Sequence, residues 1–165
     1  MKTFIIIAFI LTKSLLHGQE IHTLTETPRP KFTFKFNQLK LNDTLIISAT
    51  IMDCGEFGGH NENIYIYIQD NKIFAKLKRD KLCDTENVKN NPKAKFVEIV
   101  ELPTNSQNTI LNYINKFNDF VPDPNIISNA PTDFWIKFKN ENYDFHDQTG
   151  RWKEFLIIRN TLFAK

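Results

Sequence analysis

The stretch NIYIYIQDNKIFAKLK, residues 63–78, decides the fold of this chain. Isoleucines alternate with tyrosines in its first half, so the two residue types lie on opposite faces of one strand. The pair Asp70-Asn71 tolerates the positive φ angles that a two-residue hairpin turn requires. Residues 72–78 have the composition of a returning strand. The stretch therefore predicts a β-hairpin.

The segments on both sides of this hairpin extend the sheet. KFTFKFN, residues 31–37, alternates phenylalanine with polar side chains and predicts a strand with one buried face. TLIISATIMD, residues 44–53, is apolar on both faces, which favours a central position in the sheet. Further strands are predicted over 96–102 and 133–140, and Glu141-Asn142 is the predicted turn into a short return over 143–146.

Two segments have the period of a helix instead. In the first, Thr104 and Gln107 have the spacing of a capping box at the helix start. The apolar side chains that follow at helical spacing are Ile110, Leu111, Ile114, Phe117 and Val121. In the closing segment, the residues that share one helix face are Trp152, Phe155, Leu156, Arg159, Leu162 and Phe163. The predicted fold is α+β: an antiparallel sheet of about five to seven strands, with two helices (about 104–121 and 150–163) packed on one face.

The N-terminus has the pattern of an export signal. Residues 1–19 carry Lys2, an apolar run from Phe4 to Leu11 and a more polar end, which is typical of a cleaved signal peptide. A core helix or an uncleaved anchor is the alternative. Residues 20–30 are polar and carry two prolines, which predicts a flexible lead-in, and 31–165 then form a single α+β domain. We expect an exported protein, periplasmic, cell-surface or extracellular, that meets the membrane only through its signal.

The charge of the exported chain excludes a nucleic-acid function. The whole chain has 21 basic and 19 acidic residues, and cleavage removes Lys2 and Lys13, so 19 of each sign remain. Nucleic-acid binding needs a basic face, and the longest basic patch is the short KLKRDK at 76–81. The expected partner is therefore a protein or an envelope ligand rather than nucleic acid.

The motif DCGEFGGH, residues 53–60, holds one of only two cysteines, Cys54 and Cys83. In an oxidising compartment an even pair favours a disulfide. Closing a loop of about 30 residues would stabilise the fold by roughly 3.6 kcal/mol in the chain-entropy description. Gly58-Gly59 allows positive φ or close backbone approach before the next strand. His60 at the end of the motif is predicted as a turn residue that bonds to backbone.

Two other interpretations of this motif stay open. A zinc site would use Asp53, Cys54, His60 and Cys83, with Glu56, Asp84 or His146 as further ligands, although the spacing lacks the tight ligand pairs of structural zinc sites. A catalytic site would use Glu56, His60 or His146 as acid, base or partner of a thiol. No G-x-S-x-G, phosphate loop or H-E-x-x-H is present. We assign no catalytic residue and expect no cofactor.

A second polar and aromatic stretch, YDFHDQTGRW, spans residues 143–152. Tyr143, His146 and Trp152 are candidates for a ligand-stacking surface. The simpler interpretation makes Phe145 and Trp152 core anchors, with Asp147 and Thr149 capping the final helix.

DCGEFGGH, the hairpin, Cys83-Asp84 and YDFHDQTGRW together resemble a pattern in small exported bacterial proteins of unknown function. The resemblance covers the chain from Asp53 onward. It implies a secreted domain with Cys54 paired to Cys83, and it implies no catalytic residues. We therefore expect a small exported, non-enzymatic binding protein of the cell envelope; the alternative is a secreted hydrolase or metal-dependent enzyme centred on residues 53–60.

Overall fold

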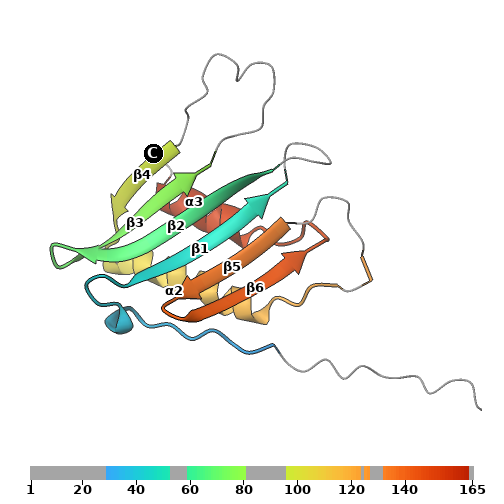
Figure 1. Ribbon diagram of the computed structural model, residues 1–165, viewed down its shortest axis with the longest axis horizontal. Helices are drawn as coiled ribbons and strands as arrows, with labels where there is room; N and C mark the ends of the chain where they lie inside the picture. The colour runs from blue at the N-terminus through green and yellow to red at the C-terminus, as the bar shows by residue number, and fades with distance from the viewer. Residues whose placement is uncertain (1–28, 53–58, 81–95, 124, 127–131, 164–165) are drawn as a thin grey trace, which may run out of the picture. The chain divides into compact units, whose positions relative to one another are not determined.

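The fold was taken from a computed structural model, which describes residues 29–52, 59–80, 96–123, 125–126 and 132–163. The chain divides between Pro30 and Lys31 into two units, and the sheet and its helices belong to the second unit, Lys31–Lys165. Figure 1 shows the layers of this unit: one sheet, with helices across one of its faces.

The described residues form a six-stranded antiparallel sheet in the order β4-β3-β2-β1-β5-β6. The strands are β1 (Thr44–Ile51), β2 (His60–Gln69), β3 (Lys72–Arg79), β4 (Phe96–Glu101), β5 (Thr132–Phe138) and β6 (Glu141–Asp147). β1 is central, as its apolar composition predicted. The predicted hairpin is β2–β3, and its turn residues Asp70 and Asn71 have φ angles of 50° and 59°. Both residue types accept this left-handed conformation, so the turn matches the twist of the strands.

The two helices are α2 (Thr104–Asp119) and α3 (Glu154–Phe163), and they cover one face, here called the inner face (Figure 1). The α+β fold with both helices on one side is thus confirmed. Alternate residues of each strand point into this layer. The fully buried aliphatic side chains among them are Leu45, Ile47, Ala49, Ile64, Ile66, Ala75, Leu77 and Ile136.

An aromatic cluster closes the core between the helices and the β5–β6 half of the sheet. Trp152 lies at its centre, with ring centroids 5.0 Å from Phe120, 5.2 Å from Phe145 and 5.8 Å from Tyr113. Burial of such rings contributes much of the stability of a small domain.

The predicted strand over 31–37 is wrong. Residues 31–35, here called the arm, are extended but do not join the sheet, and a short 3-10 helix, η1 (Phe36–Gln38), follows. The alternating pattern still marks burial, since Phe32 and Phe34 are 1% and 6% exposed. The arm lacks a partner strand because the side chain of Asn118 in α2 takes up the backbone N–H and C=O of Phe32 instead, at 2.9 and 2.8 Å.

Three local predictions also need correction. The β5–β6 turn lies at Lys139-Asn140, two residues before the predicted Glu141-Asn142, and Lys139 has φ 54°. No capping box forms at Thr104; the Gln107 side chain donates to the Leu102 carbonyl at 3.2 Å. The last helix begins at Glu154 rather than 150, because the carboxylate of Asp147 holds residues 149–152 in a loop.

Candidate functional site

The carboxylate of Glu62, on the inner face of β2, collects three basic side chains at one end of the sheet. Glu62 and His60 are 1% and 5% exposed. Nε2 of His60 lies 2.9 Å from Oε1 of Glu62. Nη1 of Arg159 donates to both carboxylate oxygens at 3.0 and 3.1 Å, and Nε of Arg79 lies 2.8 Å from Oε1. We call these four residues the Glu62 cluster.

The cluster joins three elements that are distant in the chain. His60 and Glu62 come from β2, Arg79 from the end of β3, and Arg159 from α3. A carboxylate this deeply buried is stable only when it is paired and hydrogen-bonded. The cluster therefore fixes α3 against the β2–β3 end of the sheet. Gly59, the residue before His60, has to be a glycine because the backbone of Ile51 approaches it closely. A Cβ at this position would lie 2.6 Å from the Ile51 carbonyl oxygen.

The prediction of His60 as a turn residue is wrong. His60 is the first residue of β2 and pairs with a side chain. Glu62 and Arg79 were not identified from the sequence. A sequence signal for Glu62 was present. It continues the alternation of Ile66 and Ile64, as His60 does, and this alternation places all four residues on the buried face of the strand.

The remaining residues predicted around DCGEFGGH lie outside the described residues. They are Asp53, Cys54, Glu56, Cys83 and Asp84. The disulfide and the zinc site therefore stay predictions. Within the described ranges, no three His, Cys, Asp or Glu side chains form a group that could hold a metal ion.

The residues predicted as a ligand-stacking surface are divided between the two faces of the sheet. Trp152 is buried in the aromatic cluster, and Tyr143 packs on Phe32 of the arm with ring centroids 5.3 Å apart. His146 is exposed on the opposite, outer face, where its Nδ1 pairs with the carboxylate of Asp133.

Asp147 is the organising residue of the loop before α3. Its carboxylate accepts from the backbone N–H of Thr149 at 2.8 Å, from the Thr149 hydroxyl at 2.6 Å and from the backbone N–H of Trp152 at 2.9 Å. Burial alone would raise the pKa of Asp147, but these hydrogen bonds outweigh it and hold the pKa below its usual value.

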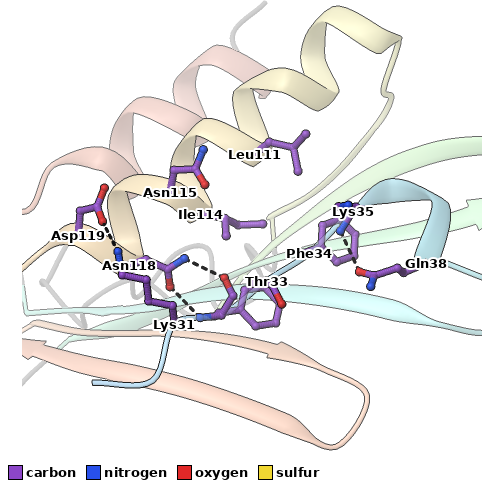
Figure 2. A pocket seen from close by; sticks show the side chains of 11 residues that line it. Lys31, Thr33, Phe34, Lys35, Gln38, Leu111, Ile114, Asn115, Asn118 and Asp119 are labelled. Atoms are coloured by element: carbon purple, nitrogen blue, oxygen red, sulfur yellow. Dashed lines mark hydrogen bonds and ion pairs between the residues drawn. The ribbon is translucent and has the colours of Figure 1, made fainter. Parts of the chain in front are cut away.

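A groove of about 820 Å³ lies between the arm and α2. Figure 2 shows Asn118 reaching from α2 to the arm, with Asn115 one turn earlier on the same helix. Lys31 and Asp119 close one end with an ion pair of 3.1 Å. The contacts that bridge this groove attach the arm to the helix layer, so we interpret it as a structural junction.

The outer face of the sheet carries partly exposed aromatic rings. The helices α2 and α3 cover the inner side (Figure 1), and Phe32 and Phe34 of the arm belong to the buried core. Tyr65 and Tyr67 of β2, with Thr44, Lys76 and Lys78, line a hollow of about 600 Å³. We call it the tyrosine hollow.

A second hollow of about 680 Å³ lies across β1, β5 and β6 on the same face. Its lining includes Thr50, Asp133, Trp135, Lys137, Asn142 and Asp144. We call it the tryptophan hollow. Register places it beside the tyrosine hollow: Ser48 of β1 is paired with Asn63 on one side and Trp135 on the other. The lining of the tryptophan hollow therefore places ionic, hydroxyl and amide groups around the ring of Trp135.

No protein-family model, curated protein or solved structure matches this chain. Among the helices of the described residues, none is long and apolar enough to cross a membrane.

Proposed function

We propose that this chain is a small exported, non-enzymatic binding protein of the cell envelope, and that the outer face of its sheet is the binding surface. The observation that carries the proposal is the set of rings on that face. Tyr65, Tyr67 and Phe74 on β2 and β3, and Trp135 on β5 beyond the intervening β1, remain partly exposed. Partly exposed aromatic rings with polar side chains around them are enriched at interaction sites.

The polar surroundings of the rings support binding. The hydroxyl groups of Ser48 and Thr50 donate to the side-chain oxygens of Asn63 and Asn61, both at 2.7 Å. These cross-strand pairs hold the asparagine side chains in place, so a ligand would meet donors that are already ordered. Such preorganisation reduces the entropic cost of binding.

The proposal is tested by sedimenting the purified exported protein with cell envelopes isolated from the organism that makes it. We expect the wild-type chain to co-sediment and Trp135→Ala and Tyr67→Ala to remain largely in the supernatant. Ile157→Ala, which removes a half-exposed apolar side chain from α3, is the matched control and should co-sediment like wild type. Equal sedimentation of all four proteins, or none, would contradict the proposal.

One observation keeps the enzymatic alternative as a second candidate: the ring of His60 lies 2.9 Å from a carboxylate. A histidine and a carboxylate at this distance form an acid–base pair. However, two arginines hold the Glu62 oxygens, which suits a structural ion network better than proton transfer. Hydrolysis of ester, phosphate or glycoside reporter substrates that disappears in a folded His60→Ala variant would favour the enzyme.

A further inference from the structure

We propose that the outer face of the sheet binds a neutral oligosaccharide, which lies across the strands and contacts both the tyrosine hollow and the tryptophan hollow. This inference rests on the proposed function, since it names the ligand class of the same surface.

The rings supply the first requirement of sugar recognition. The C–H faces of a sugar ring are apolar, and they pack flat against aromatic rings that are accessible but held in place. Trp135 stands in the tryptophan hollow, next to Ser48 and Asp144 in the strand register. Tyr65 and Tyr67 stand in the tyrosine hollow. Large rings with few rotatable bonds lose little entropy when a ligand covers them.

The side chains around the rings supply the second requirement. Sugar hydroxyl groups both donate and accept, so their sites need both kinds of partner. Carboxylates of Asp133 and Asp144 accept, the ammonium of Lys137 donates, and the amide of Asn142 does both. A ligand with only acceptors or only donors would leave half of these groups unpaired, at a cost in binding free energy.

The distribution of charge argues for a neutral ligand. On the β5–β6 half, Asp133 and Lys137 flank Trp135 along β5 and Asp144 lies beside it on β6, while Lys76 and Lys78 occupy the other half. Lys72 is already paired with Glu101 at 2.8 Å. Taken together, the two hollows carry charges of both signs. The face therefore does not attract a polyanion or a polycation along its length. It fits an uncharged ligand rich in hydroxyl groups.

The spacing of the hollows argues for an oligomer. The tyrosine hollow is centred on β2 and the tryptophan hollow on β5, with β1 between them. Two strand spacings of about 4.8 Å separate these strands, and each residue along a strand adds about 3.3 Å. Tyr65 and Tyr67 lie two and four residues along the sheet from the level of Trp135, so these rings are roughly 12 and 16 Å from it. A single sugar ring covers one hollow, and only a chain of rings reaches both. Affinity should therefore rise with chain length.

Isothermal titration calorimetry with soluble β-1,4-glucose, β-1,4-N-acetylglucosamine and β-1,4-mannose oligomers tests the inference. The full exported chain is titrated with the monomer, dimer and hexamer of each. We expect at least one hexamer to bind, with the dimer weaker and the monomer weaker still. Raising the ionic strength should leave the affinity nearly unchanged, since a neutral ligand forms no ion pairs with the face.

Four variants locate the site. Trp135→Ala should weaken hexamer binding by about thirtyfold or more, as expected for a central ring contact. Asp144→Ala changes an exposed side chain, is expected to fold normally and should also weaken binding. Tyr67→Ala should mainly remove the gain from dimer to hexamer. Ile157→Ala, on the helix layer, should bind like wild type.

The outcomes separate this inference from the proposed function. If no oligosaccharide binds but envelope sedimentation still depends on Trp135 and is lost after protease treatment of the envelopes, the ligand is a protein: the function stands and this inference fails. If oligosaccharides bind equally to wild type, Trp135→Ala and Asp144→Ala, the site is elsewhere and the inference also fails. If neither envelopes nor oligosaccharides bind, both proposals fall.

Discussion

Glu62 shows how much depends on single side chains in this molecule. It lies on the inner face of β2, the same face as the fully buried Ile64 two residues further along the strand. The carboxylate is tolerated there only because guanidinium groups from β3 and α3 reach it. Breaking one partner of such a network leaves charges uncompensated in a region of low dielectric constant.

Replacing this carboxylate should therefore destabilise the protein. We expect Glu62→Gln to lower the free energy of unfolding by about 2–4 kcal/mol, because Arg79 and Arg159 are left facing each other without a counter-charge. Urea denaturation followed by circular dichroism measures the change. The control is Glu101→Gln, whose exposed pair with Lys72 should contribute less than about 1 kcal/mol. A loss at Glu62 no larger than at Glu101 would contradict the structural role of the cluster.

Asp147 gives a prediction for pH dependence. Its pKa is lower in the folded chain than in the unfolded one, so the folded state binds the proton less tightly. Its contribution to stability is complete above the unfolded pKa of about 3.9 and is lost as the pH falls through the lower folded pKa. In Asp147→Asn, the free energy of unfolding should fall less steeply on acidification below about pH 5. Identical slopes for the two proteins between neutral pH and about pH 2 would refute this.

At the scale of elements, the arm is held by a side chain rather than by a strand. Asn118 provides an acceptor and a donor to Phe32, as a neighbouring strand would. An extended segment thereby seals the inner layer beside β5 and β6, and ring centroids of Phe34 and Phe138 are 5.1 Å apart.

Removing this contact should release the arm. Asn118→Ala loses its two hydrogen bonds to Phe32. The control is Asn112→Ala on the same helix, whose exposed side chain has no hydrogen bond to any residue that the structure describes. Both variants gain the higher helix propensity of alanine. We expect Asn118→Ala to be less stable than Asn112→Ala by about 1–3 kcal/mol. The amide of Phe32 should exchange faster only in Asn118→Ala. Equal stability and exchange in the two variants would mean that packing of Phe32 and Phe34 holds the arm.

Elements whose pattern is local could be predicted from the sequence. The alternation over 63–78, its Asp70-Asn71 turn and the apolar composition of β1 were enough to predict the sheet's central strands. Elements that depend on distant partners could not be predicted. The arm has the alternation of a strand, but Asn118 occupies its backbone. The turn at Lys139 was missed for a local reason, because lysine, here with φ 54°, rarely marks a left-handed turn position.

The candidate sites follow the same division. Alternation assigns Tyr65 and Tyr67 to the face opposite the isoleucines, but it does not reveal that Trp135 lies two strands away on the same surface. The Glu62 cluster draws its residues from β2, β3 and α3, and one sequence contains no signal that these three meet. His146 lies on the outer face, and its role in binding or catalysis stays a prediction.

For the whole molecule, export and the disulfide remain predictions with a direct measurement. The intact mass of protein from the exported fraction, taken without reductant, should match cleavage near Gly18 or Gln19 and be two hydrogens lighter than the dithiol. Reduction should then lower the free energy of unfolding by about 3–4 kcal/mol, since the loop between Cys54 and Cys83 is no longer closed. Two free thiols or an added metal mass would reverse the assignment.

The position of β1 has a consequence for the order in which the chain assembles. One edge of β1 pairs with β2, the next strand in sequence, whereas the other edge pairs with β5, so Ile47 lies beside both Ile64 and Ile136. A chain that emerges from its N-terminus can build β1 to β4 early, but the second edge of β1 must wait until β5 has emerged. Such distant pairing is slow, and a waiting apolar edge is prone to intermolecular pairing. Pulsed hydrogen exchange during refolding should protect the β1 amides that face β2 before those that face β5, and the interval between the two is the period in which this protein is most exposed to aggregation.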